Sequence, residues 1–135
     1  MGKLALTSLL TLSLVSEGIG NFVRGISASK ESSASIAARE YHLSHFQTEV
    51  LHCIRQIENG PPGREYGVLH AAALDRGELT QARWAAGTIQ KRLRTPSELS
   101  EFANRWAPPG ADNDPGRLNE YWLGNMHACL GEKIG

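Results

Sequence analysis

Apolar side chains recur every three or four residues along much of the chain, which is the spacing of amphipathic helices. We expect the first clear helix over residues 45–58, because its apolar positions form one continuous stripe. Residues 59–63 end it, since prolines cannot continue a helix and glycine favours a cap. The stripe consists of Phe46, Val50, Cys53, Ile54 and Ile57.

Three further helices are predicted from the same spacing and from start signals. One covers residues 79–92, a second starts at the Thr-Pro pair of residues 95–96, and a third starts at the Asp-Pro pair of residues 114–115 and ends at Gly131. Residues 64–69 are too short for more than a small strand, so we expect a mostly α fold with a short irregular or β-hairpin segment. The residues expected to face the core are Ala82, Ala85, Ala86, Ile89, Leu93, Leu99, Phe102, Ala103, Trp106, Leu118, Trp122, Met126 or Asn125, and Cys129.

The N-terminal third is predicted to lie outside this helical domain. Residues 1–26 join one lysine to an apolar run, which is typical of a signal peptide or of an amphipathic N-terminal helix, and both interpretations stay open. Residues 27–44 begin with a Ser/Ala-rich stretch in which Ile36 is the one large apolar residue, so they are assigned to a linker or weak helix. The lysozyme-like domain inferred below is predicted to span residues 45–130.

Composition narrows the partners and cofactors. The 135 residues include 14 Lys plus Arg and 14 Asp plus Glu, so no net charge attracts nucleic acid. The five histidines show no metal-ligand spacing, and we expect neither a metal nor another cofactor. Cys53 and Cys129 fall on the apolar faces of predicted helices, where buried thiols are favoured. A disulfide is the alternative, but it requires a Cα separation that the sequence does not reveal.

Glu58 is the candidate catalytic acid. It lies in the last turn of its predicted helix, at the edge of the apolar stripe. Both the negative end of the helix dipole and partial burial favour the protonated carboxyl, the form that a general acid needs. The glycine-rich turn that follows would let a substrate approach closely.

Two sequence blocks resemble small lysozyme-like proteins of bacteria and phages. Residues 57–60 (Ile-Glu-Asn-Gly), followed by residues 63–68 (Gly-Arg-Glu-Tyr-Gly-Val), are similar to the motif in which a catalytic Glu ends a helix. Residues 102–109 (Phe-Ala-Asn-Arg-Trp-Ala-Pro-Pro), with residues 112–114 (Asp-Asn-Asp) after them, resemble the block before the last helix of such proteins. The resemblance covers about residues 45–130.

The resemblance implies that Glu58 protonates the β-1,4 glycosidic oxygen between N-acetylmuramic acid and N-acetylglucosamine in peptidoglycan glycan strands. A second carboxylate would make the enzyme a lysozyme. With a single Glu, the muramic 6-hydroxyl attacks instead and gives the anhydro product of a lytic transglycosylase. The candidate second carboxylates are Glu65, Asp75, Asp112 and Asp114, of which the last two are better explained as a turn and a helix cap. Both reactions therefore remain open.

Four more residues are candidate contacts to the glycan, although each also has a structural explanation: Tyr66, Arg64, Gln90 and Asn113. The alternative function is a non-catalytic lysozyme-like structural or wall-binding module of a virion or secretion apparatus. The enzyme is expected to be secreted or periplasmic, and the module to be virion-associated. In either case we expect the membrane to be contacted only transiently, through the N-terminal segment.

Overall fold

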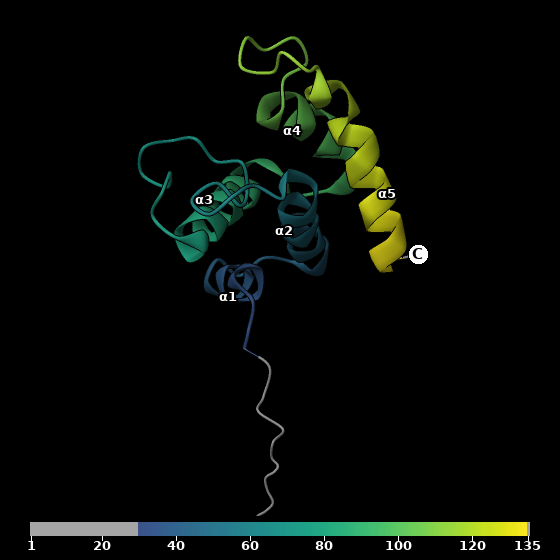
Figure 1. The fold of residues 1–135 in the computed structure, drawn as a ribbon. Coiled ribbons are helices and arrows are strands. Elements are labelled where there is room, and N and C mark those ends of the chain that lie inside the picture. The colour runs from purple at the N-terminus through teal and green to yellow at the C-terminus, as the bar shows by residue number, and fades with distance from the viewer. Residues whose placement is uncertain (1–29, 135) are drawn as a thin grey trace, which may run out of the picture. The chain divides into compact units, whose positions relative to one another are not determined.

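The fold is built around one helix, α2, which packs against α1, α3 and α5 (Figure 1). The computed structural model describes residues 30–134, and within them it contains helices, short 3₁₀ turns and irregular loops but no strand. The mostly α-helical class predicted from the sequence is therefore confirmed. The helices are α1 (Ser33–Glu40), α2 (His45–Glu58), α3 (Glu78–Arg92), α4 (Leu99–Trp106) and α5 (Trp122–Ile134).

Helix α2 has the predicted boundaries, and side-chain caps explain them. The Ser44 hydroxyl accepts the backbone N–H of Gln47, and the Gln47 side chain accepts the N–H of Ser44 in return. At the other end Asn59 adopts a left-handed conformation (φ 41°), in which its N–H bonds back to the carbonyl of Arg55. Gln47 also donates to the carbonyl of Leu93 at 2.8 Å, which joins the start of α2 to the end of α3.

Of the two forms expected for residues 27–44, a linker or a weak helix, the helix is observed in the part that the structure describes. Residues 33–40 form α1, whose Ser32 cap accepts the N–H of Ser35. The helix buries three alanines, Ala34, Ala37 and Ala38, and packs against α3. Small side chains let two helix backbones approach closely, so α1 needs no large apolar residue to bury a face. The compact unit thus begins at Ser32 rather than at residue 45.

The segment between α2 and α3 is irregular and forms no hairpin. Pro61 and Pro62 lack backbone donors, and Gly63, Gly67 and Asp75 have positive φ angles, so extended pairing is interrupted throughout. The backbone instead turns repeatedly before α3 begins. Of the two forms expected for this segment, the irregular one is therefore observed.

The C-terminal half follows the prediction in outline and departs from it in detail. A 3₁₀ turn (Pro96–Glu98) precedes α4, and a second (Leu118–Tyr121) precedes α5. Leu118 was expected in the core but is 71% exposed, because it belongs to the turn and not to the helix. Helix α5 also continues through Gly131, the expected end, to Ile134.

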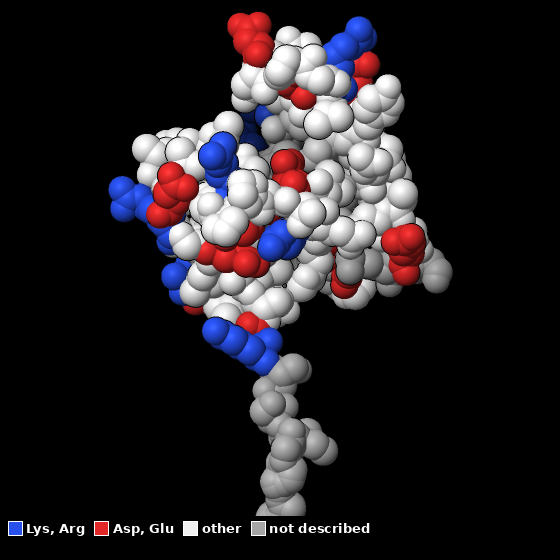
Figure 2. All heavy atoms as spheres, viewed as in Figure 1, with Lys and Arg blue, Asp and Glu red and all other residues white. Residues whose placement is uncertain are grey.

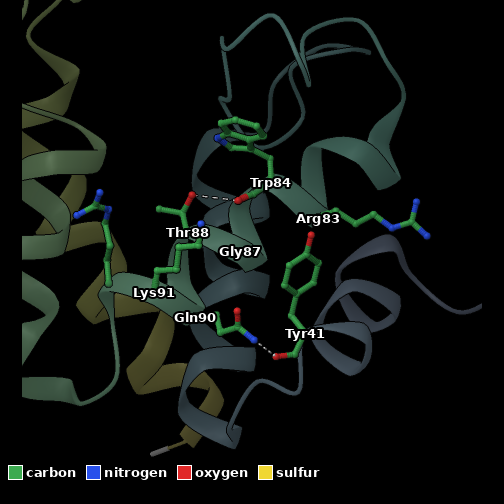
Figure 3. Close-up of a pocket in the computed structure, with 8 residues that line it drawn as sticks. Tyr41, Arg83, Trp84, Gly87, Thr88, Gln90 and Lys91 are labelled. Atoms are coloured by element: carbon green, nitrogen blue, oxygen red, sulfur yellow. Dashed lines mark hydrogen bonds between the residues drawn. The ribbon is translucent and has the colours of Figure 1, made fainter.

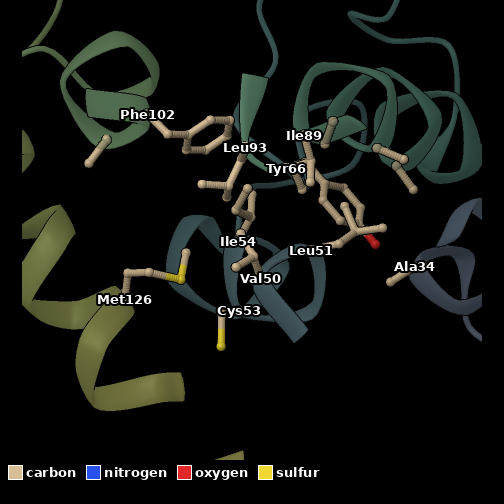
Figure 4. Close-up of a cluster of buried hydrophobic side chains, with 14 of the residues drawn as sticks. Ala34, Val50, Leu51, Cys53, Ile54, Tyr66, Ile89, Leu93, Phe102 and Met126 are labelled. Atoms are coloured by element: carbon tan, nitrogen blue, oxygen red, sulfur yellow. The ribbon is translucent and has the colours of Figure 1, made fainter. Parts of the chain in front are cut away.

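The hydrophobic core lies between α2 and the helices around it (Figure 4). All five residues predicted to form the inner face of α3 and its C-terminal flank are buried, as are Phe102, Trp122 and Met126. Cys53 and Cys129 form a disulfide with a Cα separation of 5.9 Å, so the prediction of free thiols is wrong. The thiols were correctly expected to face the core, but the packing of α2 against α5 brings them within bonding distance.

The distribution of charged side chains over the surface agrees with the equal numbers of acidic and basic residues in the sequence. Figure 2 shows Lys, Arg, Asp and Glu side chains scattered over this face of the molecule with no large region of one sign. None of the helices within residues 30–134 has the length and hydropathy of a membrane-spanning segment. The predicted signal-like or amphipathic segment, residues 1–26, lies outside the described residues.

We expect the disulfide to stabilise the fold, because it links positions 76 residues apart and so restricts the unfolded chain. Replacing both Cys53 and Cys129 by Ala should lower the free energy of unfolding by about 2–5 kcal/mol. Urea denaturation with and without a reductant measures this. The double variant serves as the control, since a reductant should leave its midpoint unchanged; an unchanged midpoint for the wild type would contradict the prediction.

Candidate active site

The Glu58 side chain is held by two tryptophans from different helices. Its Oε2 accepts the indole N–H of Trp122 at 2.9 Å and that of Trp106 at 3.2 Å. An indole nitrogen only donates, so Oε2 is the acceptor in both bonds. The half-buried carboxyl at the end of α2 is thereby fixed by the end of α4 and the start of α5.

The other oxygen of Glu58 lies against the turn that follows α2. A Cβ added to Gly67 would lie 2.4 Å from Oε1 of Glu58, which is far inside van der Waals contact. Gly67 also has φ +74°, a conformation that side chains other than glycine rarely adopt. The sequence suggested that a glycine-rich turn would make room for substrate. In the structure, Gly67 makes room for the candidate acid itself.

The Glu58 cavity opens between the end of α2 and the start of α5. Its volume is about 500 Å³, the largest of those described. Tyr121 is 64% exposed at its edge, and Asn125 is also exposed, so the cavity offers an aromatic face and an amide next to the carboxyl. Such groups suit a polyhydroxylated ligand, which stacks on aromatic rings and bonds to amides. The lining residues are Ile57, Glu58, Asp114, Leu118, Asn119, Tyr121, Trp122 and Asn125.

Of the candidate second carboxylates, only Asp114 shares this cavity. Its Oδ1 accepts the backbone N–H of Leu118 at 3.0 Å and its Oδ2 that of Asn119 at 2.8 Å. Both oxygens thus hold the 3₁₀ turn before α5, whereas the sequence predicted Asp114 as the N-cap of a helix starting at Pro115. Asp112 is exposed in the preceding turn.

The two remaining carboxylates belong to the irregular segment and line none of the described cavities. Asp75 has a positive φ of 59° and packs on Gly63, whose added Cβ would meet Asp75 Oδ1 at 2.3 Å. Glu65 is buried, and its Oε1 has no hydrogen-bond partner within the described residues. Glu58 therefore has no second, unoccupied carboxylate beside it in the cavity.

Tyr66, predicted to contact the glycan, is instead part of the core. It is fully buried, and its hydroxyl has no hydrogen-bond partner among residues 30–134. Burial raises the pKa of the phenol, and the nearby Glu78 carboxylate raises it further, so the hydroxyl stays neutral. The packing explanation for Tyr66 is therefore the correct one.

The other three predicted contacts also lie outside the lining of the Glu58 cavity. Gln90 donates to the carbonyl of Tyr41 at 2.7 Å and so joins α3 to the turn after α1 (Figure 3). Arg64 and Asn113 are exposed in turns, and in the described part of the chain neither side chain forms a hydrogen bond. Of the candidate acid and the four predicted glycan contacts, only Glu58 lines this cavity.

Gln81 is a site residue that the sequence analysis missed. It is fully buried on α3, and its Oε1 accepts the N–H groups of Tyr66 and Val68, both at 3.2 Å. Its Nε2 donates to the carbonyls of Val68 and Ala73 at 2.9 and 3.1 Å. One amide side chain therefore fixes the backbone on both sides of Gly67, the residue against Glu58. A glutamine directly beside the alanine stripe of α3 was the available signal.

We predict that Gln81→Met lowers the free energy of unfolding by about 3 kcal/mol or more, because four buried backbone groups lose their partner. Methionine keeps the length of the side chain but makes none of these bonds. Urea denaturation measures the loss, and Gln90→Met on the same helix is the matched control, which removes one exposed bond. Equal effects of the two changes would show that Gln81 does not hold the turn.

No family model, no curated protein and no solved structure matches this chain. Two features bear on its function: the resemblance of the two sequence blocks and the geometry around Glu58. That geometry combines an oriented carboxyl, an open cavity with amide and aromatic groups, and a cap that occupies Asp114.

Proposed function

We propose that this protein is lysozyme-like and cleaves the β-1,4 bond between N-acetylmuramic acid and N-acetylglucosamine in peptidoglycan, with Glu58 as the general acid. The observation that carries the proposal is the half-buried Glu58 carboxyl, held by two indole N–H groups at the edge of a cavity of about 500 Å³. A fixed carboxyl beside an open cavity can meet a bound glycosidic oxygen without first reorganising.

The hydrogen bonds suggest which oxygen carries the proton. Because Oε2 of Glu58 already accepts two N–H groups, an acidic proton belongs on Oε1. In the proposed reaction this proton goes to the oxygen of the leaving N-acetylglucosamine as its bond to C1 of the muramic residue breaks. The carboxylate that remains can then accept a proton from the group that attacks C1.

The lytic transglycosylase branch is the better supported of the two. Hydrolysis in most glycosidases uses a second carboxylate, either as nucleophile or to activate water. Asp114 shares the cavity with Glu58, but both of its oxygens accept backbone N–H groups. We therefore propose that the muramic 6-hydroxyl attacks C1 and returns its proton to Glu58, which gives a 1,6-anhydro end.

The Cys53–Cys129 disulfide supports the proposed location outside the cytosol. Disulfides form and persist in oxidising compartments, which include the periplasm and the extracellular space. Peptidoglycan is also reached from these compartments. We accordingly propose a secreted or periplasmic enzyme.

A non-catalytic wall-binding or virion module is the second candidate. The observation in its favour is that Glu58 also has a structural role, since its bonds to Trp106 and Trp122 join the ends of three helices. A carboxylate can remain at such a position without doing chemistry. The two candidates differ in whether the protein releases fragments from cell walls.

The decisive variant is Glu58→Gln, because the glutamine carbonyl can still accept both indole bonds while the acid is lost. We expect the wild type to clear a suspension of purified cell walls and to release muropeptides with anhydro ends. Glu58→Gln should clear the walls at least about 100-fold more slowly. Turbidity gives the rate and mass spectrometry of the soluble products identifies their ends.

Thermal unfolding of Glu58→Gln is the control for folding, and Glu58→Ala is the comparison that loses both indole bonds. Equal clearing by the wild type and Glu58→Gln would exclude Glu58 as the acid. Wall binding without clearing by the wild type would favour the non-catalytic module.

A further inference from the structure

A second hollow lies between α3 and α4, beside the turn at residues 67–70. Its volume is about 270 Å³, and it continues into another of about 250 Å³, with which it shares Thr88, Arg105 and Trp106. We call this continuous surface the α3–α4 groove. It shares no lining residue with the Glu58 cavity, although two of its lining residues, Gly67 and Trp106, lie against Glu58. The residues that characterise it are His70, Trp84, Thr88, Arg92, Arg105 and Trp106.

Trp84 presents an aromatic surface in this groove. It is 39% exposed, although a large apolar side chain is costly to leave in water. In Figure 3 it projects from α3 toward the loop that precedes this helix. His70 stacks on its ring, with centroids 4.4 Å apart and planes 23° from parallel. The ring is therefore held in one orientation by a neighbour while part of it stays open to a ligand.

Two exposed guanidinium groups accompany the aromatic surface. Arg55, Arg83 and Arg117 each pair with a glutamate, whereas neither Arg92 nor Arg105 forms an ion pair with a described residue. Glu98 and Glu101 stand at the far end of the groove, where they line a smaller hollow with both arginines. Arg105 extends from that end to the hollow that contains Trp84, so its charge is available to a ligand lying there.

This combination suits a ligand with both an apolar ring face and a carboxylate. Sugar rings stack their C–H faces on aromatic side chains, and guanidinium groups bind carboxylates through paired hydrogen bonds. A neutral saccharide would use only the aromatic part of the groove. A peptide without a ring would use only the arginines.

We propose that the α3–α4 groove binds a carboxylate-bearing saccharide, with a ring on Trp84 and the carboxylate on Arg105. The inference rests on the proposed function for its choice of glycan: in peptidoglycan the carboxylate belongs to the lactyl group of a peptide-free muramic residue or to the peptide stem attached there. Trp106 lines the groove and also donates to Glu58, so a strand bound in the groove lies beside a residue that orients the proposed acid.

Calorimetry with three soluble probes tests the proposal, using full-length Glu58→Gln so that no probe is cleaved. The probes are a neutral N-acetylglucosamine oligomer, a peptide-free oligomer of alternating N-acetylmuramic acid and N-acetylglucosamine, and the same oligomer with peptide stems. We expect at least one acidic probe to bind about tenfold or more tightly than the neutral one. Tight binding of the peptide-free probe assigns the carboxylate to the lactyl group, and tight binding of the stem-bearing probe alone assigns it to the stem.

Arg105→Gln should abolish the preference for acidic probes, while Trp84→Ala should weaken all three. Arg94→Gln is the matched control, because Arg94 is exposed just beyond α3 and lines none of the described hollows. All these positions are exposed, and circular dichroism checks that each variant is folded. Binding of the neutral probe as tightly as the acidic ones, no binding of any probe, or an unchanged preference in Arg105→Gln would overturn the proposal.

The two proposals fail separately. If the wild type clears cell walls but Arg105→Gln keeps its preference for acidic probes, the groove proposal is contradicted and the proposed enzymatic function stands. If the preference for acidic probes depends on Arg105 but the wild type clears no cell walls, the proposed enzymatic function is contradicted and the groove proposal stands.

Discussion

Two indole N–H groups donate to the same carboxylate oxygen of Glu58, and the arrangement of α2, α4 and α5 depends on this pair of hydrogen bonds. Helix α2 supplies the carboxyl, while α4 and α5 each supply a tryptophan at one end. A half-buried carboxylate without partners would be costly, and an indole N–H without an acceptor adds to the cost. Each group therefore requires the other two, and together they bring the ends of three helices to one point.

Other contacts of the fold hold the elements that meet there. The Cys53–Cys129 disulfide links α2 covalently to α5, and this link restricts how far Trp122 can move from Glu58. Gln81 holds the turn with Gly67, and Gly67 leaves just enough space for the second carboxyl oxygen. The candidate site is thus positioned by contacts that span the whole helical unit and not by a local motif alone.

Much of the fold was predictable from apolar spacing, since α2, α3 and α4 bury large or regularly placed residues. Helix α1 was predicted only as a linker or weak helix, because it is buried through alanines, which carry little hydropathy signal. The disulfide was missed because the approach of Cys53 to Cys129 depends on the packing of α2 against α5. Glu58 was predicted as the candidate acid from its position at a helix end and from the resemblance of the residues around it, but its partners Trp106 and Trp122 were expected only as core residues. The direction of an indole N–H is a tertiary property, and one sequence does not reveal it.

The four bonds of Gln81 also bear on which changes of length the loop before α3 can accept. The Gln81 side chain is hydrogen-bonded to the backbone at Tyr66, Val68 and Ala73, and it therefore fixes the distances between these three residues. Residues 69–72 lie between Val68 and Ala73, and their side chains are exposed. A residue inserted there can therefore extend outward into solvent. An insertion between Tyr66 and Val68 would shift Gly67 away from Glu58. Related chains should therefore vary in length at the outer part of this loop and keep a constant count of residues at its inner part.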